Sequence, residues 1–261
     1  MTFERRHLAG RAYALVSTTM ERMGVLAAFS ERPGGASEGP FVGLNVSYTV
    51  GDDPGAVAKN RDRLTEGLGV PPFAVAGLAH GRTVTRVGTK RAGAGFHRPT
   101  EAISRVDGLF TATSGVSLAV TMADCVPVVM ASEEESRVAV VHAGWRGIVA
   151  GVVASAVDVF SEPRSVRVVI GPAIGPCHYE VGEDVALAVA AASGAGATTE
   201  LRNGHRYLDL VATVRGLLRH VGVRRVEHTG LCTACERSRF FSYRRDGGVT
   251  GRQAAVVMRL P

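Results

Sequence analysis

Short runs of β-branched and small apolar residues, each ended by a polar or glycine-containing break, dominate the middle of this chain. Three such runs cover residues 116–122, 126–130 and 138–141, and a fourth covers 73–79. Apolar runs of this length, bounded by turn residues, predict β-strands. Apolar side chains that recur every three or four residues predict helices over 148–160, over 207–221, and from Pro54 onward, where Asp53 caps the first turn.

Metal-binding side chains lie at the ends of these runs. Cys125 occupies the break between two predicted strands, and His142 ends the next one. His80 ends the fourth run, and Gly81 behind it lets the backbone turn away. Because catalytic zinc takes three protein ligands and keeps one position open, two His and one Cys that share a pocket predict a catalytic zinc site. On spacing alone, however, hydrogen-bonded histidines and a buried thiol are the commoner explanation.

Longer blocks around these residues resemble a known family. The chain is similar, in order from residues 43–45 to its C-terminus, to the laccase-domain family, whose members are named polyphenol oxidase, purine nucleoside phosphorylase or peptidoglycan editing factor. The blocks that carry the resemblance are Gly43-Leu44-Asn45, Ala123-Asp124-Cys125-Val126-Pro127, His142-Ala143-Gly144-Trp145-Arg146-Gly147, Gly171-Pro172-Ala173-Ile174-Gly175-Pro176-Cys177, Phe240-Phe241-Ser242-Tyr243-Arg244-Arg245-Asp246 and Thr250-Gly251-Arg252.

The resemblance implies both a fold and an activity. It implies one compact α+β domain over residues 1–261, with mixed β-sheets flanked by helices, and zinc held by His80, Cys125 and His142. It also implies phosphorolysis of adenosine, inosine and methylthioadenosine, with hydrolytic deamination of adenosine as a second activity. The family usually reads Gln-Val-His-Gly around the first ligand, whereas this chain has Leu78 in place of the Gln. We therefore expect the metal site to be kept and the substrate range or the rate to differ, because residues around a metal site tune it.

Polar residues within the same blocks are candidates for contacts with substrate. Asn45 and Asp124 are candidates for contacting substrate or supporting the ligands, although both residue types also simply form turns. Arg146 follows His142 near a predicted helix start, where phosphate is favoured, and Arg244 is a second candidate for binding an anion. Tyr243 or its neighbour Phe241 can offer a face for stacking on a purine.

The charge of the chain suits an anionic co-substrate better than a nucleic acid. The formal net charge is +6, and Lys59 and Lys90 are the only lysines among 30 basic residues. These residues are interspersed with acids, and no block of five like charges occurs, so we predict no nucleic-acid binding. Phosphate fits the positive charge, because the guanidinium fork matches its oxygens.

The chain shows neither a secretion signal nor a stretch of about 20 apolar residues, so we predict a cytoplasmic protein without a membrane contact. In that reducing compartment its four cysteines are ligands or free thiols rather than disulfides. Cys232 and Cys235 form a C-x-x-C pair. This spacing occurs in zinc sites and in redox motifs, but Cys177, His178 and His228 lack the spacing of a zinc ribbon, which favours a structural loop.

Other functions for the His–Cys–His set remain open from the sequence. A copper polyphenol oxidase is one, since two His and a Cys also bind copper, but no His-x-His pair typical of multicopper enzymes is present. A cysteine hydrolase with His142 as base is another, and it needs no metal. A role in editing peptidoglycan precursors, implied for part of the family, can use the same site. The sequence makes no prediction of oligomeric state.

Overall fold

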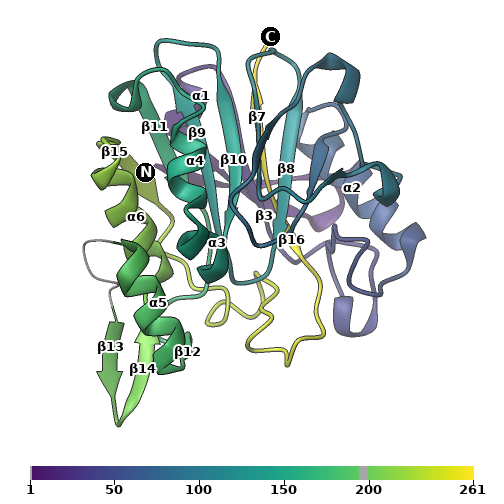
Figure 1. Cartoon of the computed structure of the whole chain (residues 1–261). Helices are drawn as coiled ribbons and strands as arrows, with labels where there is room; N and C mark the ends of the chain where they lie inside the picture. Colours follow the sequence, from purple (N-terminus) through teal and green to yellow (C-terminus); the bar gives the residue numbers. More distant parts are fainter. Residues whose placement is uncertain (1, 194–198) are drawn as a thin grey trace.

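Two mixed β-sheets packed face to face form the centre of the protein (Figure 1). The computed structural model describes residues 2–193 and 199–261. In the first sheet the strands follow the order β1 (Phe3–His7), β2 (Tyr13–Ser17), β3 (Val25–Ser30), β16 (Gln253–Arg259), β8 (Ser117–Met122), β4 (Ala74–Gly77) and β6 (Ile103–Ser104). In the second sheet the order is β15 (Arg225–His228), β11 (Val166–Ile170), β9 (Val126–Ser132), β10 (Val138–Ala143), β7 (Gly108–Thr111) and β5 (Val84–Arg86).

A small third sheet projects from one end of the molecule, at the bottom of Figure 1. Its strands follow the order β12 (Glu180–Val181), β14 (His205–Leu208) and β13 (Thr199–Arg202). The α-helices are α1 (Thr18–Glu21), α2 (Pro54–Leu68), α3 (Trp145–Ala150), α4 (Val152–Val157), α5 (Glu183–Ser193) and α6 (Leu210–His220).

The apolar side chains form layers that explain why the central strands read as continuous apolar runs. In β9 the side chains of Val129 and Ala131 pack between the two large sheets, whereas Val128 and Met130 pack under α4 and α6. Successive strand residues point to opposite faces, so a strand covered on both faces needs apolar residues at every position. The outer face of the first sheet is covered by α2, whose Leu64 is fully buried. The result is a helix–sheet–sheet–helix arrangement in which α2 lies opposite α4 and α6 (Figure 1).

Most elements predicted from the sequence are present. The predicted strands correspond to β4, β8, β9 and β10, and Asp53 caps α2 by accepting the backbone N–H of Ala56. The prediction of one continuous helix over 148–160 is wrong, because the chain breaks it into α3 and α4 at Gly151, whose φ of 92° lies in the left-handed region. The helix predicted over 207–221 begins only at Leu210, after the capping residue Asp209. The predicted class of fold, α+β with mixed sheets and flanking helices in one compact domain, is confirmed.

Two connections in this topology position the chemically important residues. Between β8 and β9 the chain crosses from the first sheet to the second, and Cys125 lies at the crossing. In the second sheet β11 and β15 are parallel neighbours, so the loops that follow them leave the same edge of the sheet. Among the described residues, no helix has the length and hydropathy needed to cross a membrane.

Candidate metal centre

The side chains of His80, Cys125 and His142 meet at one point. Their ligand atoms all lie within 4.8 Å of one another, although the residues come from the loop after β4, the β8–β9 crossing and the end of β10. The two imidazole rings lie edge to face, with centroids 5.0 Å apart and planes at 88°. His142 is buried, whereas His80 is exposed, so the cluster lies at the border between core and solvent. The structure thus brings together the three residues that the sequence predicts as ligands.

Asp107, which sequence reasoning missed, supports two of these residues. Its fully buried carboxylate accepts hydrogen bonds from the backbone N–H of His80 at 2.9 Å and of Gly81 at 2.6 Å. Its Oδ1 also lies 3.1 Å from Nδ1 of His142. Burial raises the pKa of Asp107, but the hydrogen bond from His142 and the backbone N–H groups outweigh it and lower the pKa below its ordinary value. An ionised carboxylate can only accept, so Nδ1 of His142 carries the proton and Nε2 is left for a metal.

The backbone around the cluster is held in special conformations. His80 has a φ of 57°, which a residue with a side chain rarely adopts, and the two hydrogen bonds to Asp107 stabilise this turn. Gly144 follows the β10 strand and lies directly against the ligands. A Cβ atom at Gly144 would be 2.9 Å from Sγ of Cys125 and 3.6 Å from the His80 ring. This glycine therefore provides the room in which the ligand atoms converge.

Charges in the cluster are strongly coupled. Burial raises the pKa of Cys125, but the neighbouring His142 and His80 rings outweigh it and lower the pKa to about 6. Burial lowers the pKa of His142, and Cys125 together with Asp107 reverses this and raises it to about 9. Without a metal, the pair is therefore a thiolate facing an imidazolium at neutral pH. A thiolate, an imidazole with a fixed tautomer and a second imidazole are the donor set that zinc accepts, so the residues present fit this metal.

The cluster opens into a cavity of about 770 Å³, which is large enough for a nucleoside and a small anion. Arginines dominate the charged residues of its lining, and Asp124 is the single carboxylate among the described residues there. The arginines are Arg61, Arg146, Arg244 and Arg252. Aromatic side chains supply much of the remaining wall, namely Tyr48, Trp145, Tyr179 and Tyr243. The predicted arginines, Arg146 and Arg244, thus lie at the cavity, and Arg61 and Arg252 are two that the sequence analysis missed.

The two further arginines are largely buried, which no local sequence pattern indicates. Arg61 lies on α2 and donates to the backbone carbonyls of Val46, Gly95 and Phe96, and no carboxylate of the described residues pairs with it. Burial lowers the pKa of Arg61 to about 10, which still leaves it charged at neutral pH. Burial also lowers the pKa of Arg252 below its ordinary value. Among the described residues, neither guanidinium forms an ion pair with a carboxylate, although the charges of Cys125 and Asp124 oppose part of the shift at Arg252. Positive charge held in a protein interior in this way is a favourable setting for an anion.

Asp124 lies at the cavity but its carboxylate is engaged within the protein. Oδ1 accepts the Thr233 hydroxyl at 2.6 Å, and Oδ2 accepts the backbone N–H of Arg244 at 2.7 Å. Its backbone has a φ of 93°, and its carbonyl accepts the N–H of Ile174 at 2.9 Å. Asp124 therefore ties the turn at Cys125 to three distant segments of the chain.

Asn45 is fully buried and lies outside the cavity lining. Its Oδ1 accepts the backbone N–H of Ser47 and of Arg252, and its Nδ2 donates to Asp52 at 2.7 Å. The two residues that donate to Oδ1, Ser47 and Arg252, do line the cavity. Asn45 thus connects the cavity segment at Ser47 to Arg252, which lies 207 residues after Asn45 in the chain.

Of the two aromatic residues proposed for stacking, only one reaches the cavity. Phe241 is fully buried, and its backbone is hydrogen-bonded to Gln253. Tyr243 is about half exposed and lines the cavity. Trp145 also lines the cavity, and the guanidinium of Arg146 lies over its ring at 4.4 Å. Leu78, which stands where relatives are expected to carry Gln, is another lining residue.

The fold and the site together define an α+β protein whose His–Cys–His cluster faces an arginine-lined cavity. Residues 26–260 match the model of the family described as multi-copper polyphenol oxidoreductase laccase. The chain belongs to this family, which confirms the resemblance seen in its sequence.

Relatives with similar sequences carry the name purine nucleoside phosphorylase. One from Deinococcus radiodurans is 39% identical over 236 residues, which cover 88% of this chain and 87% of that protein. Another, purine nucleoside phosphorylase SCO2081 from Streptomyces coelicolor, is 40% identical over 235 residues, which cover 88% and 93%. The crystal structure of YlmD from Geobacillus stearothermophilus superimposes with a TM-score of 0.92 at 34% identity, covering 100% of this chain and 99% of that chain.

Proposed function

We propose that this protein is a zinc-dependent purine nucleoside phosphorylase. The observation that carries the proposal is the convergence of His80, Cys125 and His142 at the wall of a cavity whose charged lining is almost entirely arginine. The names of the relatives support the same reaction class. The proposed substrates are adenosine, inosine and methylthioadenosine together with phosphate, and deamination of adenosine is a second proposed activity.

In this proposal, His80, Cys125 and His142 would hold the zinc. Zinc bound there supplies Lewis-acid stabilisation of developing negative charge and lowers the pKa of a water molecule at its open position. Asp107 fixes His142 in the tautomer that leaves Nε2 for the metal, and Gly144 leaves room for Cys125 beside it. Cys125 acts as a thiolate ligand in this proposal and not as a nucleophile.

Arg146 and Arg244 are proposed to bind phosphate. Arg146 is exposed, lines the cavity, and carries its guanidinium over the ring of Trp145. Arg244 also lines the cavity, and its side chain donates to the carbonyl of Glu180 at 2.7 Å and lies over the ring of Tyr179. In phosphorolysis, one phosphate oxygen forms a bond to ribose C1′ while the bond to the purine breaks and the base takes up a proton. Arginine forks hold the dianion in line for this attack.

The remaining predicted residues are proposed to position others. Asp124 accepts the backbone N–H of Arg244 and is proposed in this way to position the Arg244 side chain at the cavity. Asn45 holds the backbone N–H groups of Ser47 and Arg252. Neither side chain needs to contact the nucleoside for its loss to reduce activity. The purine is proposed to lie against the aromatic part of the cavity lining, to which Tyr243 and Trp145 belong.

The test is a chromatographic assay of adenosine with and without phosphate. The protein is measured as isolated, after zinc is stripped, and after zinc is restored. We expect release of adenine that requires both phosphate and zinc, and a smaller, phosphate-independent formation of inosine. His142→Ala should abolish both reactions, whereas His220→Ala, at an exposed position on α6, should retain them. Zinc-replete protein that forms neither adenine nor inosine would contradict the proposal.

The same assay separates the rival functions. A cysteine hydrolase needs no metal, so its activity would survive chelation and be lost on alkylation of Cys125. The chelation and alkylation measurements are needed because, without a metal, Cys125 and His142 form a thiolate–imidazolium pair of the kind that a cysteine hydrolase uses. A copper oxidase would consume oxygen with a phenol once copper replaces zinc, and it would not release adenine.

A further inference from the structure

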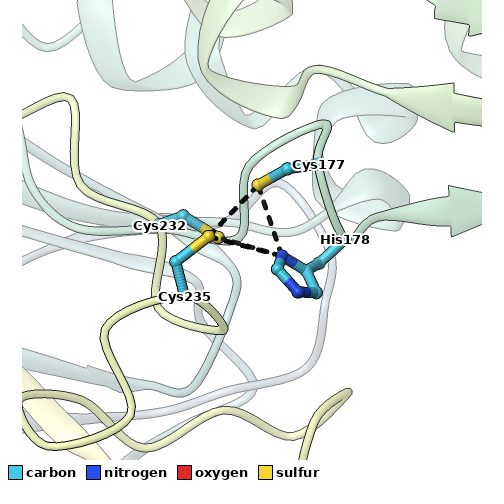
Figure 2. Close-up of side chains that lie close together, drawn as sticks. All are labelled: Cys177, His178, Cys232 and Cys235. Carbon is cyan, nitrogen blue, oxygen red and sulfur yellow. Dashed lines mark hydrogen bonds between the residues drawn. The ribbon is translucent and has the colours of Figure 1, made fainter.

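A second cluster of metal-binding side chains lies outside the cavity lining. It consists of Cys177, His178, Cys232 and Cys235, and Figure 2 shows the three sulfur atoms and Nδ1 of the imidazole turned toward one another. Two of these residues come from the loop after β11 and two from the loop after β15. Because these strands are parallel neighbours, residues more than fifty positions apart are brought to the same edge of the sheet. The structure thus brings Cys177 and His178 beside the C-x-x-C pair, which their spacing in the sequence did not indicate.

The distances within this Cys–His cluster fit a tetrahedral zinc site. With Zn–S bonds of about 2.3 Å and a Zn–N bond of about 2.0 Å, ligand atoms at tetrahedral corners are about 3.8 Å apart for two sulfurs and about 3.5 Å apart for sulfur and nitrogen. Sγ of Cys177 lies 3.5 Å from Sγ of Cys235 and 3.3 Å from Nδ1 of His178. Nδ1 of His178 lies 3.5 Å from Sγ of Cys235 and 3.9 Å from Sγ of Cys232.

The surrounding backbone prepares the cluster for a thiolate-bound cation. The N–H of Gly175 donates to Sγ of Cys232 at 3.2 Å, and the backbone N–H groups of Ala234 and Cys235 also point to this sulfur. Hydrogen bonds of this kind stabilise a thiolate over a thiol. A Cβ atom at Gly175 would lie 3.2 Å from Sγ of Cys177 and 3.3 Å from Cβ of Cys232. Glycine is thus the residue that lets the two loops close around the four ligand atoms.

We propose that Cys177, His178, Cys232 and Cys235 bind a second zinc ion, with four protein ligands and hence a structural role. All four coordination positions are filled by the chain, so this zinc has no open position for a substrate. It is distinct from the site at Cys125, to which the proposed reaction is assigned. The proposal does not depend on the reaction, because it is tested by counting metal ions.

The position of the cluster shows what such a zinc would hold together. Thr233, between two of the ligands, donates its hydroxyl to Asp124, the residue next to Cys125. Residue Ile174, on the other loop, donates its backbone N–H to the carbonyl of Asp124. Tyr179, one residue beyond His178, lines the active-site cavity. A zinc ion that joins the two loops therefore fixes one wall of the cavity, including the segment that orients Arg244.

A disulfide is the alternative use of these cysteines. Sγ of Cys177 and Sγ of Cys235 are 3.5 Å apart, which is much longer than an S–S bond of about 2.0 Å but close enough for oxidation to join them. A disulfide would remove two of the four ligands. The two states therefore exclude each other and are told apart by metal content and by mass.

The experiment measures zinc per chain in protein that is purified under reducing conditions. We expect two zinc ions in the native protein and one in His142→Ala. We expect one also in Cys235→Ser, and in this variant the remaining zinc should be the one that His142 holds. Replacing zinc by cobalt adds an optical readout. In native protein and in His142→Ala, the three sulfurs of the Cys–His cluster should give an intense thiolate-to-cobalt charge-transfer band, in addition to any band from Cys125 in native protein. Cys235→Ser should weaken this band markedly.

Two results would overturn the proposal. One is a single zinc in native protein that disappears in His142→Ala, together with three thiols that react freely with a thiol reagent. The other is a Cys177–Cys235 disulfide found by peptide mass spectrometry in protein that was alkylated within cells. If Cys235→Ser fails to fold, the cobalt spectrum of His142→Ala gives the answer alone, because that variant keeps all four ligands of the Cys–His cluster.

Discussion

Replacing Asp107 by Asn tests whether a buried carboxylate sets the geometry of the metal centre. Asn has the same shape but turns one accepting oxygen into a donating amide group. One oxygen of Asp107 accepts from His80 and faces Nδ1 of His142, while the other accepts from Gly81. Whichever way the amide is oriented, its NH₂ group must therefore face N–H donors that the carboxylate had accepted. The loss falls on the metal ligands, because two of the donors belong to them.

The magnitude follows from these contacts. A hydrogen bond to a charged group contributes about 1.5–3 kcal/mol, so the loss of one or two such bonds costs on the order of 2–5 kcal/mol of stability in the metal-free protein. Changes to the residues that orient metal ligands typically reduce metal affinity about 10–100-fold, which corresponds to about 1.4–2.7 kcal/mol. We expect Asp107→Asn to bind zinc with an affinity reduced by this factor and to unfold at a lower urea concentration.

The assay is competition for zinc with a chromophoric chelator, and urea unfolding of the metal-free protein is measured alongside it. The matched control is Asp158→Asn, the same change at an exposed position after α4, which should leave both quantities unchanged. The reasoning is refuted if Asp107→Asn binds zinc at the site of His142 with native affinity. That result would mean that the metal itself, and not Asp107, selects the tautomer of the imidazole.

Four further predictions concern the same cavity. Gly144→Ala should lower zinc affinity, since the added Cβ would lie 2.9 Å from Sγ of Cys125, and the chelator assay measures this. Zinc affinity should fall about tenfold for each pH unit below about 9, because a proton must leave His142 before zinc binds. Below about 6 it should fall more steeply, because Cys125 also takes up a proton, and chelator titrations over pH check both slopes. Arg146→Gln should raise the KM for phosphate roughly 10–100-fold and the KM for adenosine far less, as expected for a lost charge-assisted bond. Leu78→Gln should leave zinc content unchanged and change kcat/KM for adenosine relative to inosine by up to about tenfold, which steady-state assays of both substrates will show.

Much of the fold and of the metal site is predictable because the signals are local. The strands that carry Cys125 and His142 are buried on both faces, so their apolar runs are continuous and readily recognised. The cap at Asp53 also acts within a few residues of itself. The turn after β4 differs from the prediction, because His80, with a φ of 57°, adopts the left-handed conformation and Gly81 does not. The broken helix at Gly151 shows the limit of periodicity, since both halves keep the apolar spacing while the backbone between them turns.

Residues that act across the fold leave no such local signal. Asp107 precedes an ordinary Gly and a short apolar run, and its role depends on donors 26 to 35 positions away. Arg61 lies on α2 among other charged residues, and only the tertiary structure shows that it is the one that is buried. The pairing of Cys177 with Cys235 depends on two strands being parallel neighbours, which the spacing of cysteines in the sequence does not encode.

Asp124 links the His80–Cys125–His142 cluster to the Cys–His cluster. It follows β8, precedes the ligand Cys125, and its three acceptor atoms bind groups from both loops that end in the Cys–His cluster and from the segment of Arg244. A displacement of Thr233 would therefore act on Asp124, and through it on both the ligand turn and the arginine. Loss of metal from the Cys–His cluster is expected to weaken binding of phosphate before it weakens binding of zinc at His142. The reason is that the backbone of Arg244 is held by Asp124 and its side chain by the carbonyl of Glu180, close to His178, whereas Cys125 is also fixed by two strands.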